Sequence, residues 1–450
     1  MSEVLVVVGP GLVADAGLLQ EIATREFATL GVSGTLVHAR DASHVLALLT
    51  GAASAVVLPG PSDEVRGLIG RPLGAVVWVD VERADGVRAG AGAAHLHGRG
   101  INGLAWGIRH AVHRERHPSR RIAYGELPDQ WGELYLPGGP EGGRAVPVVV
   151  LVHGGYWRSI WAADLMEPLC ADLAGRGFAV WNLEYRRPDL HGWQATTADV
   201  AAGLAALTTT AASPGGVPPG DGPGDRAIPP GFAEVAGFLD LGKVAVVGHS
   251  AGAQLALRAA ADRARAAGQH VPDAGADAAR AAGQGVPGAG AGPERGAGRG
   301  AVRAGAVGGE ARIVLAVSLA GVLDLVQGDR RWLSSGAVAS ALGAPAPARL
   351  DRPAPGHPAP GHLTDDEAAR LYAESSPLLR LPLHVRQLIV QGTADDLDLV
   401  DFSRRHARAA KESGDDVIHV EMPGDHFDVI NPGTPIWQAT ARAIGSALRQ

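Results

Sequence analysis

The sequence has few residues of several kinds, and each shortage excludes a class of protein. The single cysteine, Cys170, rules out an internal disulfide and any cysteine-based metal cluster. Only two lysines occur, Lys243 and Lys411, and the arginines are scattered, so no nucleic-acid partner is expected. No apolar run is long enough to cross a bilayer, and the first residues lack the basic segment of a signal peptide. These absences predict a cytoplasmic protein without a membrane partner.

The rest of the composition is that of a globular protein: 450 residues, 46% of them hydrophobic, and a net charge of −7. This length predicts more than one domain. In the first part of the chain, short apolar runs alternate with amphipathic stretches, which predicts strands at 4–8, 35–38, 55–58, 75–81 and 93–96. Such alternation is typical of a parallel sheet covered by helices on both faces. Residues 1–117 are therefore expected to form a flavodoxin-like α/β domain.

A second α/β domain is expected over residues 118–450, because strand and helix patterns resume there in alternation. Three stretches near 211–230, 269–310 and 344–362 interrupt it and are rich in alanine, glycine and proline. Such segments bury too little apolar surface to offset the entropy of ordering them. We expect them to be disordered insertions.

A candidate nucleophile lies in the centre of the second domain. The apolar run Val244–Val247 leads into Gly248-His249-Ser250-Ala251-Gly252, and a helical pattern follows at once. This is G-x-S-x-G in the strand–turn–helix setting of a nucleophile elbow, where a tight turn holds the serine at the edge of a sheet. The pattern predicts Ser250 as a nucleophile.

Candidate oxyanion-hole residues precede this serine. The expected buried strand Pro147–Val152 runs into His153-Gly154-Gly155-Tyr156-Trp157. Glycines after such a strand let backbone amides approach a developing oxyanion without interference from side chains. In this order relative to Ser250, the segment predicts the second donor of an oxyanion hole.

A serine needs a positioned base, and the base needs a carboxylate to orient it. Asp395 and His426 supply these groups, because each follows an expected strand at its carboxyl end, where open α/β sheets place their ligands. Asp396 competes with Asp395 for the acid role; Asp395 is favoured by alignment with serine peptidases that have a Gly-Thr-Ala-Asp-Asp turn. Neither a metal nor an organic cofactor is required for this chemistry. The histidines at 95, 97, 110 and 113 lack partners at ligand spacing, so we assign them no metal.

Residues from about 122 to 450 resemble the α/β-hydrolase superfamily, whose triad follows the order Ser, Asp, His. Within it, the H-G-G-Y-W segment and the G-H-S-A-G elbow resemble those of the kynurenine formamidase (arylformamidase) group. The resemblance implies a serine hydrolase for small acyl esters or amides, with oxyanion donors at the amides of Gly154, Gly155 and Ala251. Tyr156 and Trp157 are candidate walls of an aromatic pocket, or else pack the loop.

Two other functions stay open. The G-T-A-D-D turn and the D-H-F segment also resemble acylaminoacyl and dipeptidyl peptidases, but the N-terminal region lacks the blade repeats of the β-propeller that such peptidases usually have. A non-catalytic scaffold that binds a small ligand is the alternative of another class; retention of the Ser, Asp and His residues argues against it.

The N-terminal domain faintly resembles the type II 3-dehydroquinate dehydratases in V-L-V-V-V-G-P-G-L and G-R-G-I-N-G-L-A-W-G-I. That family's asparagines are replaced here by residues such as Gly11 and Leu58, and its His-Ser-Asn segment is missing near 80–83. We therefore expect a non-catalytic domain that serves packing, substrate access or assembly into a homo-oligomer.

Overall fold

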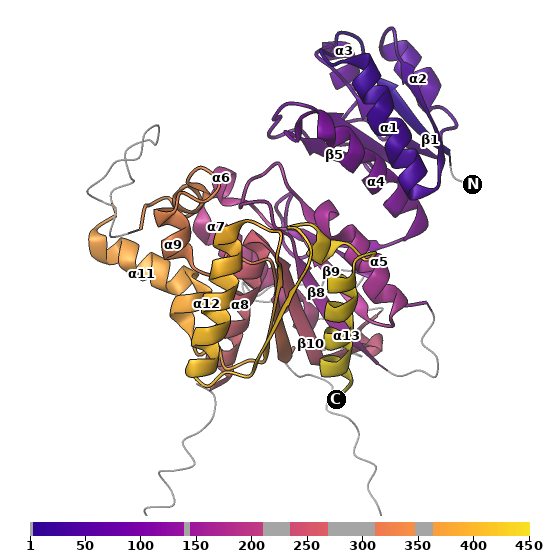
Figure 1. Cartoon of the computed structure of the whole chain (residues 1–450). Coiled ribbons are helices and arrows are strands. Elements are labelled where there is room, and N and C mark those ends of the chain that lie inside the picture. Colours follow the sequence, from indigo (N-terminus) through magenta and orange to yellow (C-terminus); the bar gives the residue numbers. More distant parts are fainter. Residues whose placement is uncertain (1–2, 139–144, 210–234, 269–310, 347–362) are drawn as a thin grey trace, which may run out of the picture.

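Two sheets organise the part of the chain that this computed structural model describes: residues 3–138, 145–209, 235–268, 311–346 and 363–450 (Figure 1). The expected insertions near 211–230 and 269–310, and most of that near 344–362, lie outside these residues. In the described ranges, no helix combines the length and apolar character needed to span a bilayer.

The N-terminal sheet confirms the flavodoxin-like prediction. Its five parallel strands stand in the order β2-β1-β3-β4-β5, which is the flavodoxin order. Their bounds are β1 Glu3–Val8, β2 Ser33–His38, β3 Ser54–Leu58, β4 Val76–Asp80 and β5 Ala94–His97. Side chains alternate across the sheet, so that Val6 packs with α1 (Ala16–Leu30) and α4 (Gly103–Arg116), whereas Val7 packs with α2 (Ala42–Leu49) and α3 (Asp63–Arg66).

The C-terminal sheet has the order β13-β12-β11-β10-β8-β9-β7-β6 and is parallel except for β7, which runs antiparallel to β6 and β9. The bounds are β6 Arg120–Ala123, β7 Trp131–Tyr135, β8 Val146–Val152, β9 Ala179–Leu183, β10 Leu239–His249, β11 Ile313–Leu319, β12 Gln387–Gly392 and β13 Val417–Met422. A turn at 124–130, closed by the Tyr124 amide on the Gln130 carbonyl, joins β6 to β7.

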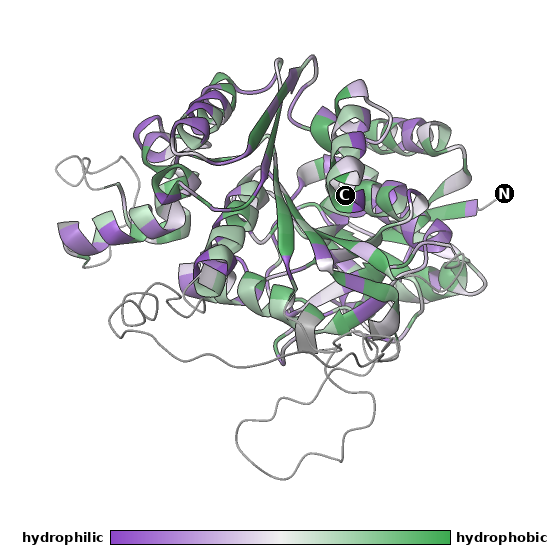
Figure 2. Ribbon diagram, turned by 90° about the horizontal axis from the view of Figure 1, so that it is seen from below, coloured by the Kyte–Doolittle hydropathy of each residue, from purple (hydrophilic) through white to green (hydrophobic). Residues whose placement is uncertain are grey.

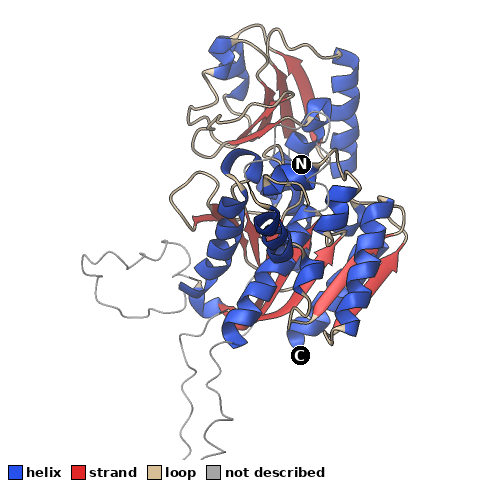
Figure 3. Cartoon of the chain, turned by 90° about the vertical axis from the view of Figure 1, so that its left-hand side faces the viewer, coloured by secondary structure: helices blue, strands red, loops and turns tan. Residues whose placement is uncertain are grey.

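Helices cover both faces of the C-terminal sheet (Figure 3). One face packs against α5 (Glu167–Gly175) and α13 (Pro435–Arg449). The other packs against α7 (Trp193–Thr209), α8 (Ala251–Gly268) and α12 (Leu397–Glu412). Shorter helices complete this side: α6 Pro188–His191, α9 Leu325–Arg330, α10 Ala337–Leu342 and α11 Asp365–Ser375. Strand β8 and the stretch Val244–Val247 of β10 are apolar runs, as strands buried on both faces require (Figure 2).

The two domains meet at the carboxyl ends of their sheets. Arg99, two residues after β5, forms a buried ion pair with Asp164, which lies between β8 and α5. His110 on α4 bonds to Glu167 at the start of α5, with 2.7 Å between Nδ1 and Oε1. The N-terminal domain is thus packed against the segment that leads out of β8.

Candidate active site

Ser250 lies in a strained turn between β10 and α8. Its φ is +54°, in the left-handed region that non-glycine residues rarely adopt. A Cβ on Gly248 would lie 2.2 Å from the carbonyl oxygen of Gly252, and a Cβ on Gly252 would lie 2.2 Å from that of Val152. Both flanking positions therefore admit only glycine, which is why the sequence reads G-x-S-x-G. The turn places Ser250 at the carboxyl edge of the sheet.

Asp395 and His426 meet at the same edge, after β12 and β13. His426 Nδ1 lies 3.0 Å from Asp395 Oδ2. The carboxylate of Asp395 also accepts hydrogen bonds from the Asp396 amide and from Gln391 Nε2, at 2.7 and 2.8 Å. Burial alone would raise the pKa of Asp395, but the bond and charge of His426, together with the other two donors, hold it below its ordinary value. Asp395 is thus a buried, ionised partner for His426.

Asp396 has a different role. Its carboxylate accepts the Asp398 amide at 2.8 Å, and the residue is the N-cap of α12. Of the two candidate acids, the structure therefore brings only Asp395 to His426.

His249 links the elbow to the loop after β13 that contains His426. Its Nε2 lies 3.0 Å from the carbonyl oxygen of His426, and because a carbonyl only accepts, His249 donates this bond. The two rings lie 4.7 Å apart between centroids. Burial, followed by the charge of His426, lowers the pKa of His249 to about 3, so His249 is neutral at physiological pH. The residue before Ser250 thereby anchors the backbone of His426.

The other contact of the predicted triad, between Ser250 and His426, is open. The described residues include no hydrogen bond between the hydroxyl of Ser250 and His426, although both lie at this edge. Such bonds are often long in enzymes without substrate and tighten when substrate binds.

The predicted oxyanion residues lie in the loop after β8 and at the start of α8, the two elements beside Ser250. A Cβ on Gly154 would lie 2.9 Å from that of Ser250, so this glycine is in direct contact with the serine. Gly155 has a φ of +110°, and a Cβ there would lie 2.3 Å from that of Trp161. Ala251 begins α8, and the first amides of a helix lack acceptors within it. The three amides thus lie on elements that flank the nucleophile.

Tyr156 and Trp157, the candidate pocket residues, differ in burial. Trp157 is only 1% exposed, and its indole donates to Gln254 at 3.2 Å and packs edge-on against Trp193. It fills the core, so its side chain is not where a pocket wall would be. Tyr156 is half-buried, and its pKa is raised by burial and then by the charges of Asp396 and Asp395. Tyr156 therefore lies near Asp396 and Asp395, the two candidate acids.

Glu184, which the sequence did not single out, holds the other end of this loop. Its Oε1 lies 3.1 Å from His153 Nε2, and its Oε2 accepts the Ala163 amide at 3.0 Å. Burial would raise its pKa, but the charges of Arg187 and His153, with these bonds, lower it to about 2. Only its place directly after β9, in N-L-E-Y-R-R-P, could have drawn attention to it.

A model of the alpha/beta hydrolase family matches residues 149–437, more than half of the chain. The chain belongs to the alpha/beta hydrolase family. The matched stretch begins within β8 and ends in α13, so it contains Gly154, Ser250, Asp395 and His426. The N-terminal sheet lies outside it.

Solved structures similar to this chain include two esterases and a bifunctional GH43-CE protein. Esterase B from Lactobacillus rhamnosis is 16% identical with a TM-score of 0.48, over 76% of this chain and 91% of that one. A bacterial heroin esterase is 19% identical with a TM-score of 0.45, over 74% and 83%. A bifunctional GH43-CE protein from Bacteroides eggerthii is 17% identical with a TM-score of 0.47, and the match covers 73% of this chain but only 35% of that one. No curated protein matches this chain.

These comparisons give no support to the finer resemblances, to the kynurenine formamidases and the 3-dehydroquinate dehydratases.

Within the described ranges, no group of three or more His, Cys, Asp or Glu residues is arranged to hold a metal ion.

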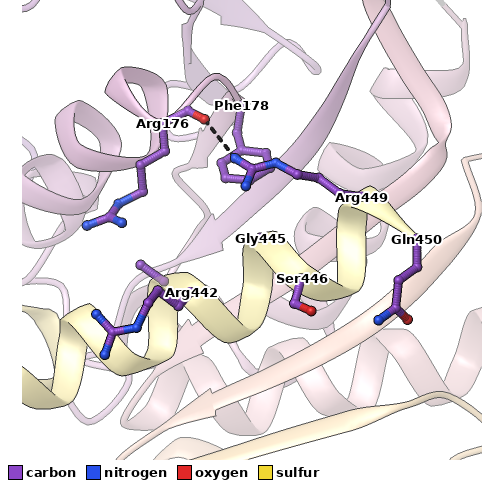
Figure 4. A pocket seen from close by; sticks show the side chains of 8 residues that line it. Arg176, Phe178, Arg442, Gly445, Ser446, Arg449 and Gln450 are labelled. Atoms are coloured by element: carbon purple, nitrogen blue, oxygen red, sulfur yellow. Dashed lines mark hydrogen bonds between the residues drawn. The ribbon is translucent and has the colours of Figure 1, made fainter.

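A cavity of about 430 Å³ lies away from this hydrolase site, at the C-terminal end of α13 (Figure 4). Arg176, Arg442 and Arg449 line it with Phe178. Arg176 is paired with Asp172, and the Arg449 guanidinium donates to the Arg176 carbonyl and lies over the ring of Phe178. It contains no member of the predicted triad.

Proposed function

We propose that this chain is a serine hydrolase that cleaves a small acyl ester or amide through Ser250, His426 and Asp395. The observation that supports this most is the convergence of a strained Ser250 elbow with the Asp395–His426 pair, whose side chains lie 3.0 Å apart, at one edge of the sheet. Three residues from separate loops thus lie at the edge where α/β enzymes carry their chemistry.

The proposed reaction has two steps. His426 takes the proton of Ser250 as the hydroxyl attacks the carbonyl carbon, and Asp395 stabilises the imidazolium that forms. The tetrahedral oxyanion is held by the amides of Gly154, Gly155 and Ala251. His426 then gives its proton to the leaving group, and water repeats the cycle on the acyl-enzyme. Losing one oxyanion donor costs about 3 kcal/mol of transition-state stabilisation in such enzymes.

Side chains around the triad favour an apolar substrate. Phe427 is 45% exposed with its ring centroid 5.5 Å from that of His426, and Leu397, two residues after Asp395, is 81% exposed. Trp106 of the N-terminal domain lies 6.3 Å from Phe427 between ring centroids. Because a second domain reaches this rim, a small molecule is a better substrate than a folded polypeptide. Tyr156 is the proposed polar member of the same wall.

The test is labelling of the full chain with a fluorophosphonate, beside a Ser250→Ala variant. Labelling and p-nitrophenyl acetate hydrolysis that both vanish in the variant would establish the serine hydrolase. Absence of labelling in folded wild-type protein would refute it and favour the ligand-binding scaffold.

Three substrates then separate the finer proposals. Preference for p-nitrophenyl esters identifies an esterase, and preference for N-formylkynurenine identifies the arylformamidase that the H-G-G-Y-W segment resembles. Cleavage of an N-acetylaminoacyl anilide in preference to both would favour the peptidase. Assembly through the N-terminal domain is a separate proposal, which light scattering of the purified chain tests.

A further inference from the structure

The N-terminal domain makes a deeply buried contact with the hydrolase domain beside the proposed oxyanion hole. We define the glycine loop as residues 153–162, between β8 and the 3₁₀ turn Ala163–Met166. Arg99 reaches this loop from the carboxyl end of β5. Its side chain is 2% exposed, and that of its partner Asp164 is 4% exposed.

The hydrogen bonds that the Arg99 side chain makes within the described residues all go to the glycine loop and the turn that follows it. Nε donates to the carbonyl of Ile160 at 2.7 Å, and Nη1 and Nη2 donate to the two carboxylate oxygens of Asp164 at 2.6 and 2.8 Å. The backbone at Gly98 lies directly against the side chain of Ile160, since a Cβ on Gly98 would lie 2.4 Å from Ile160 Cγ2. A fork of this kind fixes both position and orientation.

Arg99 also holds the side chain that covers Gly155. Its guanidinium carbon lies 4.6 Å from the ring centroid of Trp161, and Trp106 meets the same indole edge-on at 5.5 Å. Trp161 in turn lies directly against Gly155, where a Cβ would come within 2.3 Å of the tryptophan Cβ. The order of contact is therefore Arg99, Trp161 and Gly155.

A second link ties the same loop to the N-terminal domain. The Ser159 hydroxyl lies 3.1 Å from a carboxylate oxygen of Asp85 and 3.1 Å from one of Asp189, so it can donate to either. Arg83 forms ion pairs with both of these carboxylates. These side chains are more exposed than Arg99 and Asp164, so their ion pairs contribute less.

We propose that Arg99 is a positioning residue for the oxyanion hole, acting through Trp161 on the backbone of Gly155. The N-terminal domain thereby takes part in the hydrolase reaction without touching the substrate's reacting atoms. This inference rests on the proposed serine-hydrolase function. A misplacement of about 1 Å at a reacting centre can lower a rate by about 10²-fold, and amides that bind the oxyanion act mainly in the transition state.

The experiment compares Arg99→Ala, Arg99→Lys and Trp161→Leu with wild type in p-nitrophenyl acetate hydrolysis and in inhibition by phenylboronic acid. We expect kcat to fall about 10- to 100-fold in Arg99→Ala and Trp161→Leu, with KM changed less than about threefold. The boronic acid, which mimics the tetrahedral state, should bind more weakly by a similar factor. Arg99→Lys keeps one bond to Asp164 and should recover part of kcat.

Arg109→Ala is the matched control. Arg109 lies on α4, pairs with the buried carboxylate of Glu26 at 2.7 Å and also lies over Trp106, but these partners belong to the N-terminal domain. It should keep kcat within about twofold, although it also removes an arginine that bonds to both oxygens of a carboxylate.

The outcomes are distinct. Wild-type protein that neither labels nor hydrolyses esters would defeat the proposed function itself. An active wild type with unchanged kcat in folded Arg99→Ala, or an equal loss in Arg109→Ala, would overturn only the role of Arg99. If Arg99→Ala does not fold, Trp161→Leu decides, because it leaves the Arg99–Asp164 pair in place; an unchanged kcat there refutes the proposal.

Discussion

Asp395 turns its carboxylate to His426, with 3.0 Å between Oδ2 and Nδ1, whereas its neighbour Asp396 turns away to cap α12. Two adjacent aspartates thus make different contacts, one with His426 and one with the start of a helix. The difference follows from the backbone: the Asp396 amide donates to Asp395 and fixes that carboxylate at the end of β12. Asp396, one residue on, is already at the start of a helix.

Amide substitutions at these two positions should therefore have unequal effects on activity. Asp395→Asn removes the charge that stabilises the imidazolium, and we expect kcat to fall by roughly 10⁴-fold. Asp396→Asn should leave kcat within about threefold, because asparagine caps a helix as well as aspartate does. Steady-state hydrolysis of p-nitrophenyl acetate measures both. Equal losses at the two positions would contradict this division.

The glycines beside Ser250 give a second prediction. In Gly154→Ala the new methyl would lie 2.6 Å from the His249 carbonyl and 2.9 Å from Ser250 Cβ, so the loop must move. We expect a loss of about 10²- to 10³-fold in kcat, the size associated with one oxyanion donor. Gly175→Ala on α5 is the control, because nothing lies within 4 Å of its added methyl. Full activity in Gly154→Ala would show that this backbone does not bind the oxyanion.

Much of the fold and the candidate triad follows from local patterns. The G-x-S-x-G elbow is visible as a short motif because a Cβ at Gly248 would meet the Gly252 carbonyl of the same turn, and a Cβ at Gly252 would meet the Val152 carbonyl at the end of β8. Asp395 and His426 could be predicted because each lies a few residues after an expected strand, and parallel strands bring their carboxyl ends to one edge. Alternation of strands and helices likewise predicted the α/β class of both domains.

What the sequence could not predict depends on contacts between distant residues. The Arg99–Asp164 and His110–Glu167 pairs join residues 65 and 57 positions apart, and neither belongs to a motif. Nor does H-G-G-Y-W show that Trp157 points into the core. Tyr156 and Trp157 both have positive φ, which turns the chain so that neighbours face different surroundings. Side-chain direction in such a loop is set by tertiary packing.

A third prediction concerns His249, which bonds to the loop that contains His426. His249→Leu leaves the carbonyl of His426 without its donor, and we expect kcat to fall about tenfold and stability by about 1 to 3 kcal/mol. His249→Gln places an amide N–H near the original Nε2 and should restore most of both. Urea unfolding and ester hydrolysis check these values. If His249→Leu matches wild type in both assays, this residue does not position His426.

The buried pair between the domains predicts a pH dependence of stability. Burial, which outweighs the charge of His110 beside it, raises the pKa of Glu167 to about 7. Burial alone would lower the pKa of His110, but the charge and hydrogen bond of Glu167 raise it. Between pH 4.5 and 7, the folded state therefore holds a proton on Glu167 that the unfolded state has released. Stability from this group falls as pH rises, and His110 acts in the same direction above its ordinary pKa.

Glu167→Gln should remove this slope. Buried neutral histidines such as His249 and His406, whose pKa values are lowered to about 3, contribute the opposite slope below pH 6.5, so the readout is the difference between variant and wild type. From pH 5 to 8, we expect urea unfolding to show Glu167→Gln gaining about 1 to 3 kcal/mol relative to wild type. Glu367→Gln is the control, because the pKa of this exposed carboxylate is lowered and it titrates below the window. A constant difference across this range for Glu167→Gln would show that the pair does not exchange protons on unfolding, and that the interface between the domains is indifferent to pH.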